Sequence, residues 1–316
     1  MSRLSFSLSG SSSPLTAIEI GARRVTGVSL DHRGGRPVIT AHAVEPLPDD
    51  AVVPSLTASN VRDHAVVARA VERVLEQIGR PRRVGLVVGD PAGKVSLVRL
   101  QQVPTRPQDL EQVIRWQVRK SAPFAIEDAQ VGYEKGMRTD DGQDFIVTLA
   151  RRDVIAEYEA LCAAAGAHAG IVDLSTFNVV NAVLAGAGVP PGDWLLVNMG
   201  PGWESVAIMR GRQLIFFRNH TVDGEETLSD LVHQTAMYYE DRLNGSGFTR
   251  VLVSGASTSG NVDVLRRGLA ERLGAGIETV DPTTAAAFTD RIGAGTALLD
   301  TLTPLVGLVL RDREAA

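Results

Sequence analysis

The stretch LTAIEIGARRVTGVSL, residues 15–30, decides the fold of this chain. Its apolar residues run to Ile20, stop at Gly21 and resume at Val25, which is the pattern of two strands joined by a tight glycine turn. Residues 197–209 repeat this pattern in the second half of the chain. We therefore expect two related halves, each built around a strand, a glycine turn and a strand.

Hydrophobic periodicity predicts further strands and helices, so the fold class is expected to be α/β or α+β. The other expected strands are 37–44, 84–88, 96–100, 130–133, 145–150, 171–174, 214–218 and 251–253. The expected helices are 64–78, 107–121, 153–165, 178–184, 226–243 and 262–273, with 302–311 as a closing helix or strand.

The order of these segments predicts the domain organisation. Residues 1–14 are rich in serine and are expected to form a disordered leader. The block 95–168 has a helix, two strands and a helix, and we expect it to be inserted into the first half. The remaining units are 15–94 and 169–190 for the first half, 191–300 for the second, and 301–316 for a closing segment and tail.

Composition excludes several classes of function. A formal net charge of -5 does not favour a nucleic-acid partner. No apolar stretch reaches the roughly 18 residues of a membrane span, so direct membrane insertion is not expected. The single cysteine, Cys162, excludes an internal disulfide and is consistent with a reducing, cytoplasmic setting. The cysteine and the 6 histidines show no metal-ligand spacing, which argues against a zinc site.

Glycine turns between strands can bind phosphate, because glycine tolerates close approach and lets backbone N–H groups converge on an anion. One such turn is most often a plain hairpin. Here two turns occupy matching places, and a third glycine loop follows at 254–260. This arrangement favours a nucleotide site between the two halves.

The motifs around these turns, taken in order, resemble those of the PilM-type family of type IV pilus assembly proteins, which have an actin-like ATPase fold related to FtsA. The resemblance covers nearly all of residues 15–312. It rests on IEIGARRV (18–25), PFAIEDAQVGYE (123–134), VNMGPGWESVAI (197–208), DGEETL (223–228), VLVSGAS (251–257), DPTTA (281–285) and LVGLVLR (305–311).

The resemblance implies an actin-like, ribonuclease H-like fold of two domains with an inserted subdomain of the 1C type at 95–168. It also implies the residues that would contact ATP and magnesium, with Glu19 as the candidate magnesium residue. These residues are Glu19, Gly21, Ala22, Arg23, Arg24, Asn198, Gly200, Pro201, Gly202, Gly224, Glu225, Gly255, Ala256 and Ser257.

Several residues depart from the family pattern. Glu19 and Asn198 stand where the family has aspartates, and an amide is a poorer ligand for magnesium than a carboxylate. Trp203 and Glu204 stand where small hydroxyl residues are expected, and we expect Glu204 to repel a γ-phosphate. Arg23 and Arg24 would favour phosphate. We therefore expect a degenerate site, with ATP hydrolysis weak or absent and the binding of ATP left open.

The resemblance implies a cytoplasmic scaffold that reaches the inner membrane by binding the cytoplasmic tail of a PilN-like protein. The surface between residues 15–45 and 95–168 is the expected place for that tail. Self-assembly stays open. The alternatives are an active ATPase or sugar kinase of the actin fold, a GspL-like scaffold of type II secretion, and an FtsA-like division protein. Intact acidic residues in both turns would favour the active ATPase or kinase. An FtsA-like protein would have a C-terminal amphipathic helix, and residues 311–316 are too short and polar to form one.

Overall fold

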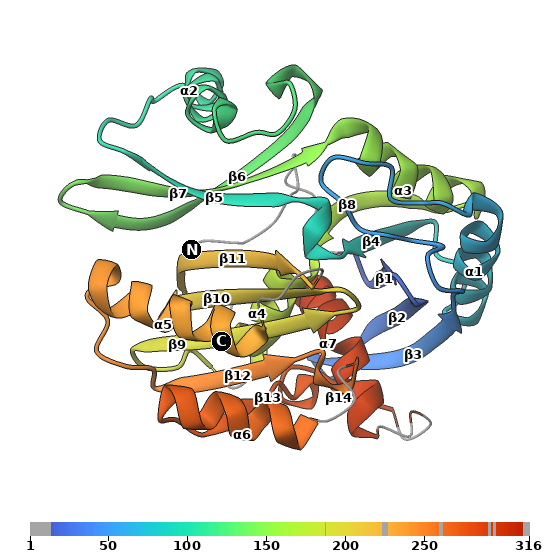
Figure 1. The fold of residues 1–316 in the computed structure, drawn as a ribbon. Helices are drawn as coiled ribbons and strands as arrows, with labels where there is room; N and C mark the ends of the chain where they lie inside the picture. The colour runs from blue at the N-terminus through green and yellow to red at the C-terminus, as the bar shows by residue number, and fades with distance from the viewer. Residues whose placement is uncertain are drawn as a thin grey trace.

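The two glycine turns each belong to a sheet with the same strand order (Figure 1). The computed structural model describes residues 14–186, 188–222, 227–258, 262–289, 292 and 295–311. The first sheet has the order β14-β3-β2-β1-β4-β8. Its strands are β1 (Thr16–Ile20), β2 (Arg24–Arg33), β3 (Arg36–Pro46), β4 (Arg83–Val88), β8 (His168–Leu174) and β14 (Ala287–Phe288).

The second sheet has the order β11-β10-β9-β12-β13. Its strands are β9 (Asp193–Gly200), β10 (Trp203–Arg210), β11 (Gln213–Thr221), β12 (Arg250–Ser254) and β13 (Ile277–Thr279). In both sheets the first strand pairs antiparallel with the second and parallel with the fourth. The carboxyl ends of β1, β4, β9 and β12 therefore carry the loops that can meet between the halves. The expected internal repeat is present in the topology.

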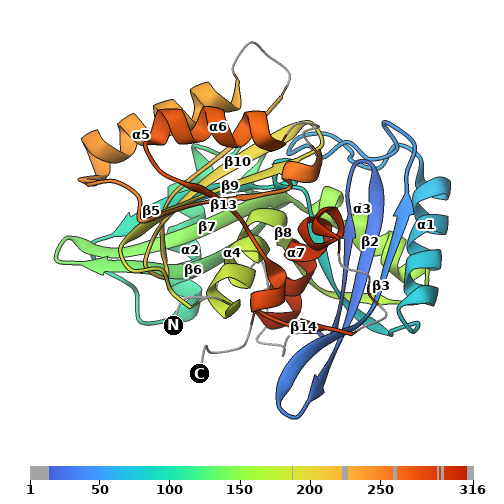
Figure 2. The same cartoon turned by 90° about the horizontal axis from the view of Figure 1, so that it is seen from below.

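Helices α4 (Ser175–Gly186) and α7 (Thr296–Leu310) lie between the two sheets (Figure 2). Gly307 makes their close contact possible, because a Cβ there would come within 1.7 Å of the Asn178 carbonyl oxygen. The other face of the first sheet packs against α1 (His64–Gln77) and α3 (Arg152–Ala164). Helices α5 (Leu228–Leu243) and α6 (Val262–Leu273) cover the second sheet.

A third sheet, β5-β7-β6, lies on the far side of β11 (Figure 1). Its strands are β5 (Lys94–Leu100), β6 (Ala129–Thr139) and β7 (Gly142–Arg151), and helix α2 (Pro107–Arg119) covers one face. Leu110, Ile114 and Phe145 are central to that small core. These elements fall within the block 95–168 that we expected to be inserted, apart from the first residue of β5.

The expected secondary structure agrees with the observed elements in type and order. Periodicity located α1 well because its buried residues recur at helical spacing, including Val67, Val71 and Val74. The closing segment is a helix, although it contains Pro304. β13 and β14 were not expected, since they have only 3 and 2 residues. β14 pairs with β3, so the chain returns to the first sheet before residue 301, and the exact domain boundaries stay a prediction.

Candidate functional site

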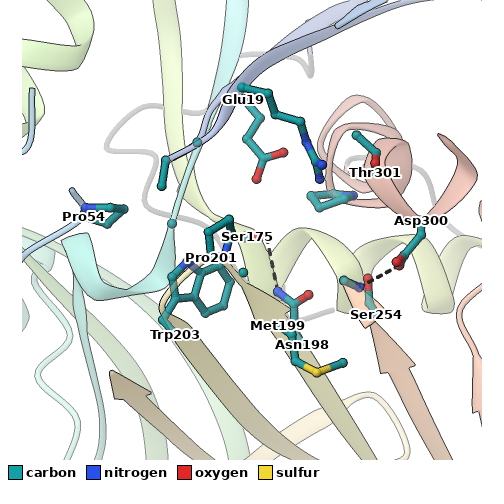
Figure 3. A pocket seen from close by; sticks show the side chains of 17 residues that line it. Glu19, Pro54, Ser175, Asn198, Met199, Pro201, Trp203, Ser254, Asp300 and Thr301 are labelled. Atoms are coloured by element: carbon teal, nitrogen blue, oxygen red, sulfur yellow. Dashed lines mark hydrogen bonds between the residues drawn. The ribbon is translucent and has the colours of Figure 1, made fainter. Parts of the chain in front are cut away.

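The two glycine turns face one another across a narrow cavity (Figure 3). From the first turn, the residues that line it are Glu19, Gly21, Ala22 and Arg24. The second turn contributes Asn198, Met199, Gly200, Pro201 and Trp203. The volume of the cavity is about 40 Å³, whereas ligand pockets usually measure about 300–1,000 Å³.

The third glycine loop and helix α7 close the far side of this cavity. Ser254 and Gly255 line it from the end of β12, and Asp300, Thr301 and Pro304 line it from α7. The Gly255 N–H donates to Asp300 Oδ1 at 2.6 Å, and the Ser257 N–H donates to Oδ2 at 2.9 Å. The carboxylate of Asp300 thus accepts both bonds from this loop.

The expected site residues fall into four groups. Eight line the cavity, namely Glu19, Gly21, Ala22, Arg24, Asn198, Gly200, Pro201 and Gly255. Arg23 and Gly202 line a neighbouring pocket of about 310 Å³ instead. Ala256 is buried and Ser257 is exposed beside the cavity, and neither side chain lines it. Gly224 and Glu225, with most of the 223–228 motif, lie outside the described residues, as do the expected leader residues 1–13.

The expectation that Glu204 faces a γ-phosphate is wrong. Side chains alternate along a strand, so Trp203 and Ser205 share one face of β10 and Glu204 lies on the other. Glu204 is absent from the cavity lining. Burial raises the pKa of Glu204 above its usual value. His220, which lies opposite Glu204 on β11, lowers this pKa by a smaller amount. Ser205, on the same face as Trp203, does not line the cavity either, because its hydroxyl donates to the buried carboxylate of Asp90.

The carboxyl group of Glu19 points into the cavity from β1 (Figure 3). Burial raises the pKa of Glu19, Arg24 lowers it in part, and nearby Asp90 adds a smaller upward effect, so that the net pKa is about 7. Glu19 and Asp300 are the acids of the described lining, and Arg24 is its base. A nucleotide phosphate would therefore meet two carboxyl groups and one guanidinium.

A buried polar network joins the two halves behind the cavity. Asp90, in the short helix Asp90–Ala92 after β4, is fully buried. Ser205 Oγ donates to Asp90 at 2.5 Å, the Thr176 N–H donates at 3.1 Å, and the Thr176 hydroxyl donates as well. The Asn198 amide group in turn donates to Thr176 Oγ1 at 2.9 Å and to Ser175 Oγ at 3.2 Å. Burial raises the Asp90 pKa, and these donors oppose the effect.

Trp203 occupies the space between the two halves. Its side chain is only 4% exposed. A Cβ on Gly200 would come within 2.2 Å of the Trp203 ring, and one on Gly89 would lie 3.2 Å from its Nε1 and 3.2 Å from Pro54. The ring therefore lies against Gly200 and between elements of both halves.

No group of three or more metal-ligating side chains is found among the described residues. Magnesium binding at Glu19 stays a prediction. Sequence reasoning missed Asp90, Ser175, Thr176 and Asp300 as members of the site. Ser175 follows directly on β8, and Asp90 follows β4 after one glycine, so a position at the end of a parallel strand was the available signal; nothing local distinguishes Asp300.

A larger pocket, of about 560 Å³, lies between the third sheet and α3. Its lining comprises Phe124, Asp128, Arg151, Arg152, Asp153 and Ala156. All of these belong to the block 95–168, and residues 15–45 contribute nothing to it. Separately, none of the helices in the described ranges is long and apolar enough to cross a bilayer.

Solved structures of known proteins resemble this fold. The chain matches one from a PilM-PilN type IV pilus biogenesis complex, with a TM-score of 0.77 and 18% identity over 94% of this chain and 96% of that one. A Bacteroides thetaiotaomicron protein with an actin-like ATPase fold and unknown function has a TM-score of 0.48 at 9% identity, over 91% and 95% of the two chains. The cytoplasmic domain of EpsL, from the Vibrio cholerae type II secretion system, has a TM-score of 0.49 at 10% identity, over 92% and 94%.

The expected fold class is confirmed, because the chain has the mixed α/β, actin-like architecture. The sequence itself also matches a family model. The matched region, residues 17–245, contains both glycine turns and the whole third sheet. The chain belongs to the family of type IV pilus assembly protein PilM.

Proposed function

We propose that this chain is an actin-like scaffold for type IV pilus assembly and binds the cytoplasmic tail of a PilN-like inner-membrane protein. The observation that carries the proposal is membership of the PilM family. The end-to-end match to the fold of a chain from a PilM-PilN complex adds support. On this proposal the protein is cytoplasmic and reaches the inner membrane through its partner.

We place the tail in the pocket between the third sheet and α3, because its volume suits several side chains of an extended peptide. Phe124 and Ala156 offer apolar surface there, and the rim carries both signs of charge. Arg152 donates to the backbone carbonyls of Glu127 and Ala129, which anchors the loop on one side of the pocket to α3. The pocket is thus preformed by contacts within the block 95–168.

The proposal extends to a nucleotide site that is degenerate. The small cavity, its two carboxyl groups and the buried Trp203 support this part. Hydrolysis in this fold needs a positioned water and a metal, which is a geometric and electrostatic task. A cavity that excludes the triphosphate cannot perform it. The chain then acts as a binding protein, and its ATP turnover is absent or very slow.

The test is titration of the purified chain with a synthetic peptide of the cytoplasmic tail of a PilN-like inner-membrane protein from the same organism. We expect Ala156→Phe to weaken binding at least tenfold, since the new ring fills the pocket. Ala160→Phe is the matched control: it is also exposed, lies one helical turn along α3 and does not line the pocket. Equal affinity of wild type and both variants contradicts this location, and failure of the wild type to bind contradicts the proposed partner.

A further inference from the structure

The backbone N–H groups of the third glycine loop already have an anion, and it comes from the chain itself. The two oxygens of the Asp300 carboxylate accept from the N–H groups of Gly255 and Ser257. Convergent backbone N–H groups of this kind are a general way to bind an anionic ligand. Bonds to a carboxylate are also stronger than bonds between neutral groups. Asp300 is 5% exposed, so water competes little for them.

This contact joins the two halves of the molecule. Asp300 belongs to α7, whose apolar residues Leu302, Leu305 and Leu308 pack with the first sheet. Gly255 follows β12 of the second sheet and has a φ of 75°. A Cβ at Gly255 would lie 1.8 Å from the Met199 carbonyl oxygen, so the loop is held directly against β9. The carboxylate thus bridges the side of the cleft opposite the Asp90 network.

Trp203 makes a second bridge. Its ring lies against Gly200 of its own turn and against Gly89 of the other half, and Pro54 also lies close to Gly89. In a cleft that opens to admit a ligand, such a ring would become exposed to water on opening. Burial of an aromatic side chain is favourable, so opening of the cleft is opposed.

We infer that Asp300 and Trp203 take the places of a nucleotide in this cleft and hold the two halves closed when no nucleotide is bound. The carboxylate supplies the anion for the third loop, and the indole fills the space between the glycine turns. The inference rests on the proposed function in one respect: it makes binding of the partner tail independent of nucleotide.

Chemical rescue tests the role of the carboxylate. Asp300→Ala removes a group of about the size of formate and leaves the N–H groups of Gly255 and Ser257 without that acceptor. We expect its Tm to fall by roughly 4–10 °C. Adding 50 mM formate should raise the Tm of this variant by several degrees more than that of wild type. Asp300→Asn should lose stability without gaining from formate, because its amide fills the space.

The matched control is Asp63→Ala. Asp63 also accepts from a backbone N–H, that of Val66 at 3.0 Å, but it is exposed at the start of α1 and outside the cleft. The Tm of Asp63→Ala should rise in formate no more than the Tm of wild type does. If Asp300→Ala is unfolded, refolding yield with and without formate replaces Tm. An Asp300→Ala variant as stable as wild type, or one that formate does not stabilise, overturns the inference.

A second measurement separates this inference from the proposed function. Wild-type Tm should shift by less than 1 °C in 5 mM Mg-ATP, and affinity for the tail peptide should change less than twofold. If Mg-ATP raises the Tm by several degrees and the peptide still binds, the inference is wrong and the scaffold stands. If the peptide does not bind but formate rescues Asp300→Ala, the scaffold is wrong and the closed cleft stands.

Discussion

Ser205 donates a 2.5 Å hydrogen bond to the carboxylate of Asp90, across the two halves of the molecule and 115 positions along the chain. Both side chains are fully buried. The bond places a second-half strand directly on the loop after β4. It also belongs to the network through Thr176 that reaches Asn198. Removing the Asp90 side chain should therefore weaken the contact between the two halves, and not only the short helix to which Asp90 belongs.

We expect Asp90→Ala to lower the free energy of unfolding by about 2–4 kcal/mol, because three donors then lose a buried acceptor. Urea unfolding measures this change. Asp31→Ala is the control, since Asp31 is exposed and accepts from its neighbour His32. A loss at Asp90 no larger than the loss at Asp31 would show that the network contributes little to stability.

The carboxyl group of Glu19 should make stability depend on pH. Its pKa is raised from 4.5 to about 7 in the folded chain. Between these values the folded protein keeps a proton that the unfolded chain has released. The contribution of Glu19 to stability is therefore full below pH 4.5 and is lost as pH rises from 4.5 through 7, by at most about 3 kcal/mol at roughly 1.4 kcal/mol per pH unit.

Glu19→Gln should remove this dependence and be more stable than wild type at pH 8. Urea unfolding at pH 5 and pH 8 gives the comparison, with the exposed Glu72→Gln as control. Asp90, whose pKa burial also raises, contributes the same sign in both proteins. The idea fails if wild type and Glu19→Gln lose the same free energy between the two pH values.

An acid at position 198 should weaken this protein. Asn198 donates to the hydroxyls of Ser175 and Thr176, and a carboxylate cannot donate. Asn198→Asp also adds a second acid near buried Asp90. We expect a loss of about 2–3 kcal/mol in urea unfolding. Asn244→Asp, at the exposed end of α5, should cost much less; equal losses would argue against a special environment at 198.

ATP turnover should be slower than about 1 s⁻¹, the low end of ordinary enzymes, in wild type and in Asn198→Asp alike. The reason is the 40 Å³ cavity, which one substitution at its wall does not enlarge enough for a triphosphate. A steady-state phosphate-release assay measures the rate. Turnover near 1 s⁻¹ in wild type would contradict the degenerate site.

Replacing glycine by alanine should have opposite effects on stability in two helices. In α7, Gly307→Ala would drive a methyl group into the backbone of α4 at Asn178, so we expect a loss of about 1–3 kcal/mol. In α6, Gly268→Ala meets only Ser229 Oγ at 3.8 Å and should gain about 0.5–1 kcal/mol through helix propensity. Thermal unfolding of the two variants gives the signs, and a gain at Gly307 would show that α4 and α7 can separate at little cost.

The local sequence determined the elements, because each carries its own signal. Val84–Val88 is apolar throughout since β4 is buried in the middle of a sheet, and α1 has helical spacing since it covers one face. The two glycine turns were visible for the same reason: glycine and a break in the apolar pattern lie together in the chain. Eight of the residues expected to meet a nucleotide do line one cavity.

The content of that cavity was decided by tertiary structure. Glu204 was expected inside it, but the alternation of β10 turns Glu204 to the opposite face, and Trp203 is the residue of this strand that lines the cavity. Asp300 carries no local signal, since its partners Gly255 and Ser257 lie more than 40 residues earlier and reach it only when α7 packs between the sheets. The sequence alone determined the two halves, their glycine turns and all the described strands except the two shortest, β13 and β14. Contacts between distant segments decided what fills the space between them, because hydrogen bonding and exclusion depend on three-dimensional distance and not on position in the chain.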